Sequence, residues 1–354
     1  MKQISFRSFF IGLIGFVVAC STQANCLDSS RLTGVNLAGA EFNSKNLPGV
    51  VFKDYTYPKA TELAFIAAQG ANIIRLPFRW ERIQRELNGP LDPAELKRLQ
   101  TTIDQAKAQG LCVLLDVHNY AKYYGEPMTT APLQDGFVAL WIALAAQFKD
   151  PEYVAFGLMN EPAHMPLNDW AVLAKRTLAE LRKAGAQNLI LMGGGGWNGL
   201  HSWFKGGEGN NNAEAFAGLN DPLKRTVIEV HQYADTYYSG TKLDCYPPEH
   251  FDSKFQRIGQ WAKDNQVQLL LGEFGMATTA PCLETLDRFL KLMAGSEWKG
   301  WTYWAAGGWW GTYAFALNSS TTEPSPQWSY LKTYFYRGQD ADASRPLPPE
   351  NATQ

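Results

Sequence analysis

The sequence carries almost no excess charge. Its 354 residues hold 32 Lys and Arg against 34 Asp and Glu, a formal charge of −2. A nucleic-acid-binding protein normally presents a basic face, so this balance argues against nucleic acid as a partner. Charged residues make up 19% and hydrophobic residues 45%, which excludes wholesale disorder and allows a large core. No apolar run is long enough to span a membrane, which takes roughly 20 residues.

Motifs of several other enzyme classes are missing. The five histidines are scattered without a His-Glu-x-x-His pattern, and there is no Cys-x-x-Cys pair, so we expect neither a metal nor a cofactor. His118, His231 and Glu273 are conceivable zinc ligands, but no His-x-His pair supports such a site. There is no Gly-x-Ser-x-Gly elbow, and the glycines at 193–196 lack the Lys-Ser/Thr of a phosphate loop.

The first 24 residues read as an export signal. Lys2 and Arg7 precede an apolar stretch at 9–19, and Thr22-Gln-Ala is a small-x-small cleavage pattern. An alternative is a lipobox ending at Cys20, which would attach the protein to a lipid anchor. Both interpretations place the mature protein outside the cytoplasm, either secreted or as an outer-membrane lipoprotein.

Cleavage after residue 24 leaves four cysteines in an oxidising compartment, where disulfides persist. Three pairings of Cys26, Cys112, Cys245 and Cys282 are possible from sequence alone. Cys112 lies in an apolar run, which favours a buried free thiol. Cys245 and Cys282 lie in polar, turn-rich stretches, which favours pairing them.

Eight short apolar runs alternate with longer segments of helical periodicity. The predicted strands are Leu32–Leu37, Asn72–Pro77, Leu111–Val117, Tyr153–Met159, Asn188–Met192, Thr226–Val230, Val267–Glu273 and Lys299–Trp304. The predicted helices are Lys59–Gln69, Pro93–Gln109, Leu133–Lys149, Leu167–Ala184, His250–Asn265 and Leu283–Ala294.

This alternation predicts an α/β protein with a single catalytic domain, a (β/α)8 TIM barrel over residues 25–336. The fifth unit is weak, because 197–221 is rich in Gly and Asn. The alternative is a doubly wound open sheet. That fold usually has a Gly-rich turn after its first strand, which this sequence lacks. Residues 337–354 are rich in Asp, Pro and Ser and predict a flexible tail.

Barrel enzymes place their catalytic groups where the strands end. Seven predicted strands end in polar or aromatic side chains, namely Arg75, His118, Asn119, Asn160, Glu161, Trp197, His231, Tyr233, Glu273 and Trp304. Helix caps would explain one such position, but seven on one rim are hard to explain in that way.

Two of these residues, Glu161 and Glu273, follow strands that face each other across a barrel of eight. Such a pair suits glycoside hydrolysis, which needs one protonated and one ionised carboxyl group. Arg75, His231 and Tyr233 would favour ionisation of one partner. The alternative is a pair of structural glutamates in salt bridges.

Eleven of the 12 tryptophans divide by position. Trp304, Trp309 and Trp310 lie at and after the last strand, where flat indole rings suit the C–H faces of sugars. Those that extend this row are Trp80, Trp197 and Trp203. Those expected in the core are Trp141, Trp170, Trp261, Trp298 and Trp301.

Seven motifs together resemble the endoglucanases of glycoside hydrolase family 5, in the order that this family shows. They are Gly34-Val-Asn-Leu-Ala-Gly, Ile74-Arg-Leu-Pro-Phe, Asp116-Val-His-Asn-Tyr, Gly157-Leu-Met-Asn-Glu-Pro, Glu229-Val-His-Gln-Tyr, Gly272-Glu-Phe-Gly and Trp304-Ala-Ala-Gly-Gly-Trp-Trp-Gly. The resemblance implies a retaining mechanism with Glu161 as acid/base and Glu273 as nucleophile. One departure is Ala163, where many relatives have His directly after Asn-Glu-Pro.

The resemblance also implies roles for the surrounding residues. Arg75 and Tyr233 match residues that contact the nucleophile, and Asn160 matches the residue that binds the sugar 2-hydroxyl. The residues expected to line the same subsite are His118, Asn119, His231 and Trp304. Trp197 and Trp310 are expected to contact sugar because of their positions after strand ends, independently of the resemblance. Cys245 and Cys282 fall where relatives carry a disulfide.

The prediction is therefore a secreted, monomeric retaining endo-β-1,4-glucanase that acts on β-glucan without a cofactor. The alternatives are a mannanase or xyloglucanase on the same barrel, or a carbohydrate-binding protein without turnover. Both catalytic glutamates are present with their neighbours, which argues against the last alternative.

Overall fold

The computed structural model describes residues 25–319 and 322–336. The predicted signal peptide at 1–24, the lipobox cysteine Cys20 and the predicted tail at 337–354 lie outside these residues. In the part of the chain that is described, no helix is long and apolar enough to cross a membrane.

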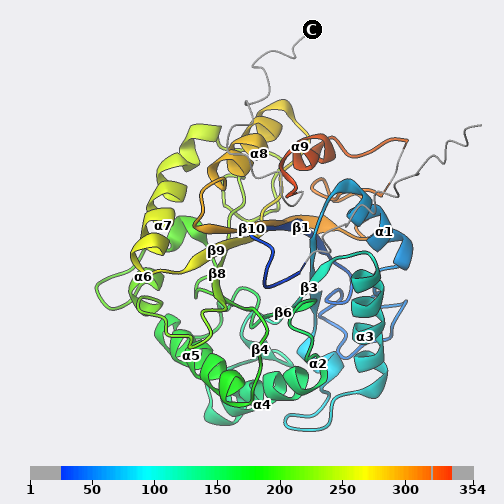
Figure 1. The fold of residues 1–354 in the computed structure, drawn as a ribbon, viewed down its shortest axis with the longest axis vertical. Coiled ribbons are helices and arrows are strands. Elements are labelled where there is room, and N and C mark those ends of the chain that lie inside the picture. Colours follow the sequence, from blue (N-terminus) through cyan, green and yellow to red (C-terminus); the bar gives the residue numbers. More distant parts are fainter. Residues whose placement is uncertain (1–24, 320–321, 337–354) are drawn as a thin grey trace, which may run out of the picture.

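Eight parallel strands close into a barrel, which confirms the predicted fold (Figure 1). The strands are β1 (Leu32–Leu37), β2 (Ile73–Phe78), β3 (Cys112–Val117), β6 (Val154–Gly157), β7 (Ile190–Gly193), β8 (Thr226–His231), β9 (Gln268–Glu273) and β10 (Trp298–Ala306). Around the barrel they follow the order β1-β10-β9-β8-β7-β6-β3-β2. A small hairpin of β4 (Lys122–Tyr123) and β5 (Glu126–Pro127) stands in the loop after β3.

Helices surround the barrel (Figure 1). The long ones are α1 (Ala60–Gln69), α3 (Pro93–Ala108), α4 (Ala131–Gln147), α5 (Leu167–Lys183), α7 (Asp252–Asp264) and α8 (Ala280–Leu292). The shorter ones are α2 (Trp80–Ile83), η1 (Leu200–Ser202), α6 (Asn212–Ala215), η2 (Pro248–Phe251) and α9 (Gln327–Tyr334). The fifth unit has only the short η1 and the four-residue α6, in keeping with its weak sequence pattern.

The start of α3 shows how local sequence sets these boundaries. The Asp92 carboxylate accepts hydrogen bonds of 3.0 Å from the backbone N–H groups of Ala94 and Glu95, and Pro93 occupies the first helical position. An acidic cap followed by proline satisfies donors that no helical carbonyl can reach.

The barrel interior changes from apolar to charged along β2 and β3. Side chains alternate with a period of two, so Ile73 and Arg75 of β2 share the inner face, as do Leu114 and Asp116 of β3. A buried apolar cluster fills the lower interior and includes Ile73 and Leu114. The charged side chains on the same inner face, Arg75 and Asp116, therefore lie nearer the carboxyl ends of these strands.

The described residues form two disulfides, Cys245–Cys282 and Cys26–Cys112. The first matches the favoured pairing. The second shows that the interpretation of Cys112 as a free thiol is wrong. Cys112 opens β3 at the bottom of the barrel, and the segment before β1 brings Cys26 there through a 2.6 Å hydrogen bond from its N–H to the Glu152 carbonyl.

Two tryptophans assigned to the sugar row belong instead to the core. Trp80 and Trp203 are fully buried. The Trp80 ring packs on Tyr123 and Phe137, and Trp203 packs on Phe216 and Trp261. Their proximity to strand ends is real, but each ring points into the layer between strands and helices.

Candidate active site

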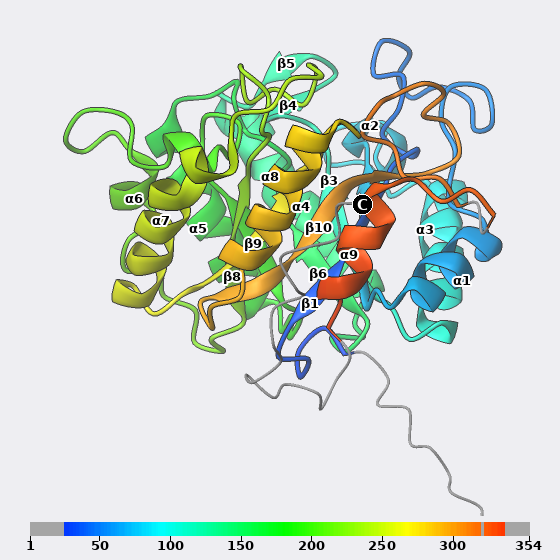
Figure 2. The same ribbon diagram turned by 90° about the horizontal axis from the view of Figure 1, so that it is seen from above.

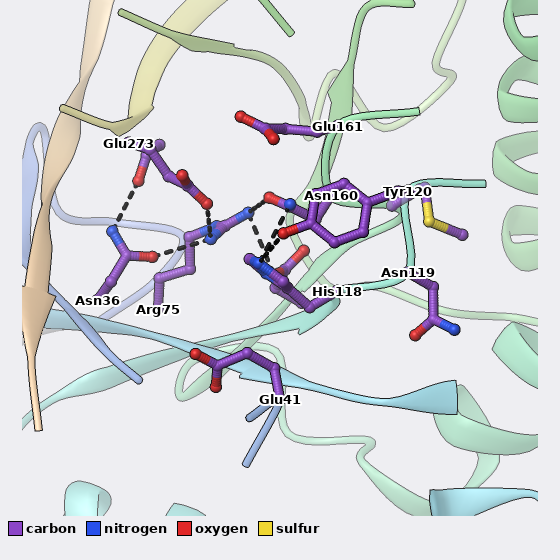
Figure 3. Close-up of polar contacts among 12 residues, drawn as sticks. Asn36, Glu41, Arg75, His118, Asn119, Tyr120, Asn160, Glu161 and Glu273 are labelled. Atoms are coloured by element: carbon purple, nitrogen blue, oxygen red, sulfur yellow. Dashed lines mark hydrogen bonds and ion pairs between the residues drawn. The ribbon is translucent and has the colours of Figure 1, made fainter. Parts of the chain in front are cut away.

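Arg75 is the centre of a buried cluster at the carboxyl end of the barrel (Figure 3). Its guanidinium lies 2.9 Å from the Glu229 carboxylate, 3.0 Å from Glu273 and 3.1 Å from Asp116. Burial opposes its charge, but these carboxylates outweigh that effect and raise the pKa of Arg75. The guanidinium therefore stays cationic and holds three strands together at the point where they end.

Glu273 is 4% exposed, and both of its carboxylate oxygens are held by donors. Oε1 accepts a 3.0 Å hydrogen bond from Arg75, and Oε2 accepts a 2.8 Å hydrogen bond from the Tyr233 hydroxyl. Both contacts are donated to the carboxylate and fix its orientation. The predicted contacts of Arg75 and Tyr233 with this residue are present.

Glu161 stands opposite Glu273 in a different environment. Its side chain is 16% exposed, and its backbone has φ +44°, a left-handed conformation that is strained for a residue with a Cβ. Burial raises the pKa of Glu161, against the opposing effect of a 2.8 Å contact with Nδ1 of His231. Nearby Glu273 raises that pKa further.

The facing oxygens of Glu161 and Glu273 lie within 4.8 Å of each other. Retaining glycosidases hold their two carboxyl groups about 5–5.5 Å apart, whereas inverting ones leave about 6.5–9.5 Å for a water molecule. An approach of this kind between single oxygens is compatible with a retaining pair.

His231 joins three of the acidic groups. Nδ1 lies 2.8 Å from Glu161 and 3.6 Å from Glu273, and Nε2 lies 3.2 Å from Glu229. Burial disfavours the charged ring, but Glu273, Glu161 and Glu229 outweigh it and raise the pKa of His231 to about 10. The ring is therefore an imidazolium at neutral pH.

Within the described ranges, one group of possible metal ligands lies close enough together to hold an ion. It consists of Glu161, His231 and Glu273. A metal would need the lone pair of a neutral imidazole. The raised pKa of His231 opposes that state, so the set suits proton transfer better than metal binding.

His118 and Asn160 connect the cluster to the rim. His118 Nδ1 lies 2.7 Å from Asp116, and its Nε2 lies 3.2 Å from the Asn160 amide nitrogen. The ring is stacked on Trp304 with centroids 5.5 Å apart. The oxygen of the Asn160 amide accepts a 2.7 Å hydrogen bond from Arg75. Burial lowers the pKa of His118 well below its usual value, so this ring is neutral.

Asn119 does not join the cluster, and the expectation that it lines the sugar subsite is wrong. Figure 3 shows its side chain apart from Arg75. Its amide donates to Glu81 at 2.8 Å and accepts from the Trp80 N–H at 2.9 Å. The residue follows His118 directly, and alternation along the chain turns it toward α2 instead of the barrel axis.

A cleft of about 520 Å³ opens on the Glu161 side of the cluster and is lined by Tyr120, Trp197 and Tyr237 among others. Trp197 is 51% exposed and Tyr237 is 73% exposed. Gly196, Trp197 and Asn198 all have left-handed backbones, with φ of +68°, +65° and +51°. This run turns the indole out of the barrel, which places Trp197 where the sequence predicts a sugar contact.

The tryptophans at the end of β10 and in the loop after it lie on the other side. Trp304 and Trp310 meet edge to face at 5.6 Å, and the Trp310 Nε1–H donates to the Ala306 carbonyl at 3.1 Å. Trp310 also packs on Phe42 from the loop after β1. Trp309 is 41% exposed. Trp304 and Trp310 thus remain half-exposed at the rim, as the prediction requires.

Several residues of the site were not singled out from the sequence. Asn36, Asp116 and Glu229 bind Arg75, and Tyr120 donates toward His118 at 3.1 Å. A charged residue inside an apolar strand, such as Asp116 or Glu229, was the available signal. Glu41 is also buried beside the site, and burial raises its pKa to about 7.

Comparison with known proteins places these observations in context. A family model described as cellulase (glycosyl hydrolase family 5) matches residues 35–308. Endo-beta-1,4-glucanase B of Aspergillus niger is 32% identical over 287 residues, which cover 80% of this chain and 84% of that protein.

Solved structures agree in fold. An endo-beta-1,4-glucanase of Xanthomonas axonopodis pv. citri superimposes with a TM-score of 0.83 at 41% identity, covering 86% of this chain and 98% of the other. The endoglucanase Cel5A of Pseudomonas stutzeri, in complex with cellobiose, gives a TM-score of 0.80 at 27% identity, covering 90% and 97%.

Proposed function

Because the chain belongs to glycoside hydrolase family 5, we propose that it cleaves internal β-1,4-glucosidic bonds of β-glucans by a retaining double displacement. Its activity is that of an endo-β-1,4-glucanase, in common with its relatives. The roles of individual residues are our inference from the geometry.

The observation that carries this inference is the close approach of Glu161 and Glu273 in contrasting environments. Arg75 and Tyr233 both donate hydrogen bonds to Glu273, whereas burial raises the pKa of Glu161 and favours its protonated form. In the first step a Glu273 oxygen bonds to the anomeric carbon. The glycosidic C–O bond breaks, and Glu161 gives its proton to the leaving oxygen.

The same pair explains why Glu161 can then act as a base. The charge of Glu273 raises the pKa of Glu161 before reaction, and that charge disappears when the glycosyl ester forms. The pKa of Glu161 therefore falls, and the carboxylate takes a proton from water. The water oxygen attacks the anomeric carbon and releases Glu273 as a carboxylate.

The cleft beside Glu161 is the place for the leaving part of the glucan, because the leaving oxygen must meet that carboxyl. Trp197 and Tyr237 supply rings there. On the opposite side Trp304 and Trp310 offer surfaces for the part that becomes bound to Glu273. Aromatic rings present large apolar faces at low conformational entropy, which suits the C–H faces of a sugar.

We also propose that the protein works outside the cytoplasm as a monomer, free or anchored through Cys20. The two disulfides support this location, since such bonds persist in oxidising compartments.

Substitution of each glutamate tests the assignment. Glu273→Gln should lower carboxymethylcellulose hydrolysis by at least about 10³-fold with the fold intact. Glu161→Ala should regain part of its activity on an aryl cellobioside with azide, because the good leaving group needs no acid and azide needs no base. Glu180→Gln on α5, with a side chain that is 39% exposed, is the matched control. Activity of Glu273→Gln near that of the control would contradict the assignment.

A second assay tests the substrate. Release of reducing ends from carboxymethylcellulose, mannan, xyloglucan and xylan should be greatest on the β-1,4-glucan, and a preference for mannan would contradict the proposed specificity.

A further inference from the structure

The loop between β1 and α1 displays an aromatic side chain in an unusual way. Phe52 is 73% exposed, and its backbone has φ +65°, where glycine is favoured. Both features are unfavourable for a phenylalanine, because water contacts the ring and a Cβ is strained in this conformation.

The loop is nevertheless firmly built. The Asp54 carboxylate accepts hydrogen bonds of 2.7 Å from the Asn43 amide and 2.8 Å from the Val50 N–H. The Phe52 N–H donates to the Tyr55 carbonyl at 2.7 Å. Phe52 is therefore held in solvent by an ordered framework, and strain of this kind is typical of segments that bind something.

A hollow of about 420 Å³ lies between Phe52 and helix α3. The Phe52 ring contributes an apolar wall, and Lys97, Thr101 and Gln105 contribute polar groups from α3. An apolar ring facing hydroxyl, amide and ammonium groups matches a pyranose, which has apolar C–H faces and hydroxyls around its edge.

This hollow is continuous in its lining with the rim of the barrel. Tyr57, Pro58 and Lys59 line it and also line a smaller hollow of about 110 Å³ that is bounded by Trp309. Figure 2 shows the loops after β1 and β10 rising together on one side of the barrel, and the contact of Phe42 with Trp310 joins them. They lie on the side of Trp304, away from the cleft beside Glu161.

We propose that the groove between Phe52 and α3 is a second binding site for a β-glucan chain, separate from the catalytic cleft. It holds polymer that extends past Trp309 on the side of the glycosyl group transferred to Glu273. The inference rests on the proposed function, because it takes the same polymer as ligand. The ligand is an uncharged glucan, and its main contact in this groove is with the Phe52 ring.

The test measures binding to amorphous cellulose in a Glu273→Gln background, where the polymer is not consumed. Phe52→Gly should weaken binding about 3- to 10-fold, since an aromatic stacking contact is lost, and Phe52→Trp should bind at least as tightly as the parent. Val172→Ser is the matched control, because Val172 is 68% exposed on α5, on another flank of the barrel. It should bind like the parent.

A measurement at high salt distinguishes binding by the Phe52 ring from binding by the nearby cations. At 0.5 M NaCl the charges of Lys59, Lys97 and Arg98 are screened, and binding of the parent should persist. Loss of parental binding in salt would overturn the proposal in favour of a cationic site for acidic polymers.

Thermal unfolding separates binding from a packing role. Glycine adopts φ +65° without strain, so Phe52→Gly should unfold at the same or a higher temperature. Normal cellulose binding by Phe52→Gly overturns the proposal. This holds whatever happens to the unfolding temperature or the oligomeric state of the variant. A lower unfolding temperature would then indicate packing, and a changed oligomeric state a contact between copies.

Activity distinguishes this inference from the proposed function. With Glu273 restored, Phe52→Gly should raise the KM for polymeric glucan while the hydrolysis of cellotetraose changes less than about twofold. If Glu273→Gln retained activity, the catalytic assignment would fail, whereas the comparison of Phe52 variants would still report on the groove. An equal loss on cellotetraose and polymer would overturn a separate site.

Discussion

Nδ1 of His231 lies 2.8 Å from Oε1 of Glu161, so an imidazolium stands directly beside the proposed general acid. Burial raises the pKa of Glu161, and the cation limits that rise. The two effects act in opposite directions on the carboxyl group that must give a proton in one step and take one in the next.

Replacement of His231 by Gln should therefore change the pH dependence of activity. Loss of the cation removes an effect that lowers the pKa of Glu161, so the pKa rises further. Because the first step needs protonated Glu161, the descending alkaline limb of kcat/KM should move up by roughly one pH unit. The measurement is kcat/KM on carboxymethylcellulose between pH 4 and pH 9. His250→Gln, outside the cluster, should leave the limb in place, and a shift of the His231→Gln limb to lower pH would contradict this role.

Gly272 should tolerate no side chain. A Cβ there would lie 2.1 Å from Oε1 of Glu229, which is buried and held by Arg75 and His231. Gly272→Ala should push this carboxylate away from Arg75 and destabilise the fold by about 3 kcal/mol, with a fall in kcat. Urea unfolding and initial rates measure both effects. Gly207→Ala, with no atom within 4 Å of the added Cβ, is the control, and equal behaviour of the two variants would refute the argument.

Two tryptophans near one strand end should respond in opposite ways. Trp203 is fully buried, so Trp203→Ala should lower the free energy of unfolding by about 3–5 kcal/mol. Trp197 is 51% exposed beside Glu161, so Trp197→Ala should leave stability nearly unchanged and raise the KM for longer cello-oligosaccharides several-fold. Denaturation and steady-state kinetics distinguish the two outcomes. A stability loss in Trp197→Ala as large as in Trp203→Ala would show that the exposed ring has no separate role.

Asp221 should govern part of the stability in acid. Although burial acts to raise its pKa, hydrogen bonds from Arg182, two of them 2.9 Å long, and from Thr226 lower it from 3.8 to about 2. The folded state thus binds this proton less well than the unfolded state. The stabilisation, about 2 kcal/mol, is complete above pH 4 and is lost as the pH falls toward 2.

Asp221→Asn should therefore be less stable than the wild type at pH 7, and the two should converge near pH 2. Chemical denaturation at a series of pH values measures the difference. Asp135→Asn removes an ion pair whose carboxylate side chain is 61% exposed, so its effect should be below about 1 kcal/mol. A difference that stays constant down to pH 2 would show that the Asp221 carboxylate is not the cause.

The order of the secondary structure was predictable because its signals are local. The alternation of apolar runs with amphipathic segments fixes eight strands, and Asp92 with Pro93 marks the start of α3. The predicted boundaries of strands and helices differ from those in the structure by a few residues. The predicted strand Tyr153–Met159 is longer than β6 (Val154–Gly157), because Leu158 and Met159 are apolar and buried without continuing the strand.

Much of the site followed from the same logic, since residues at the ends of parallel strands must meet at one end of a barrel. Arg75, Tyr233 and Glu273 do meet there. Asn119 does not, because neighbouring residues point in opposite directions and His118 takes the inward position. Asp116 and Glu229 lie inside the barrel, two residues before His118 and His231 at the rim. Composition alone did not distinguish them as partners of Arg75.

Sequence by itself determined the barrel, its class of chemistry and the presence of two glutamates at facing strand ends, because periodicity, strand order and residue type are properties of short segments. Only the tertiary structure decided which side chains share a space. It placed Trp203 in the core and Trp197 in water, joined Cys26 to Cys112, and surrounded Arg75 with acids from three strands. These outcomes depend on contacts between distant parts of the chain and on backbone turns such as the left-handed run at 196–198, which no local pattern specifies.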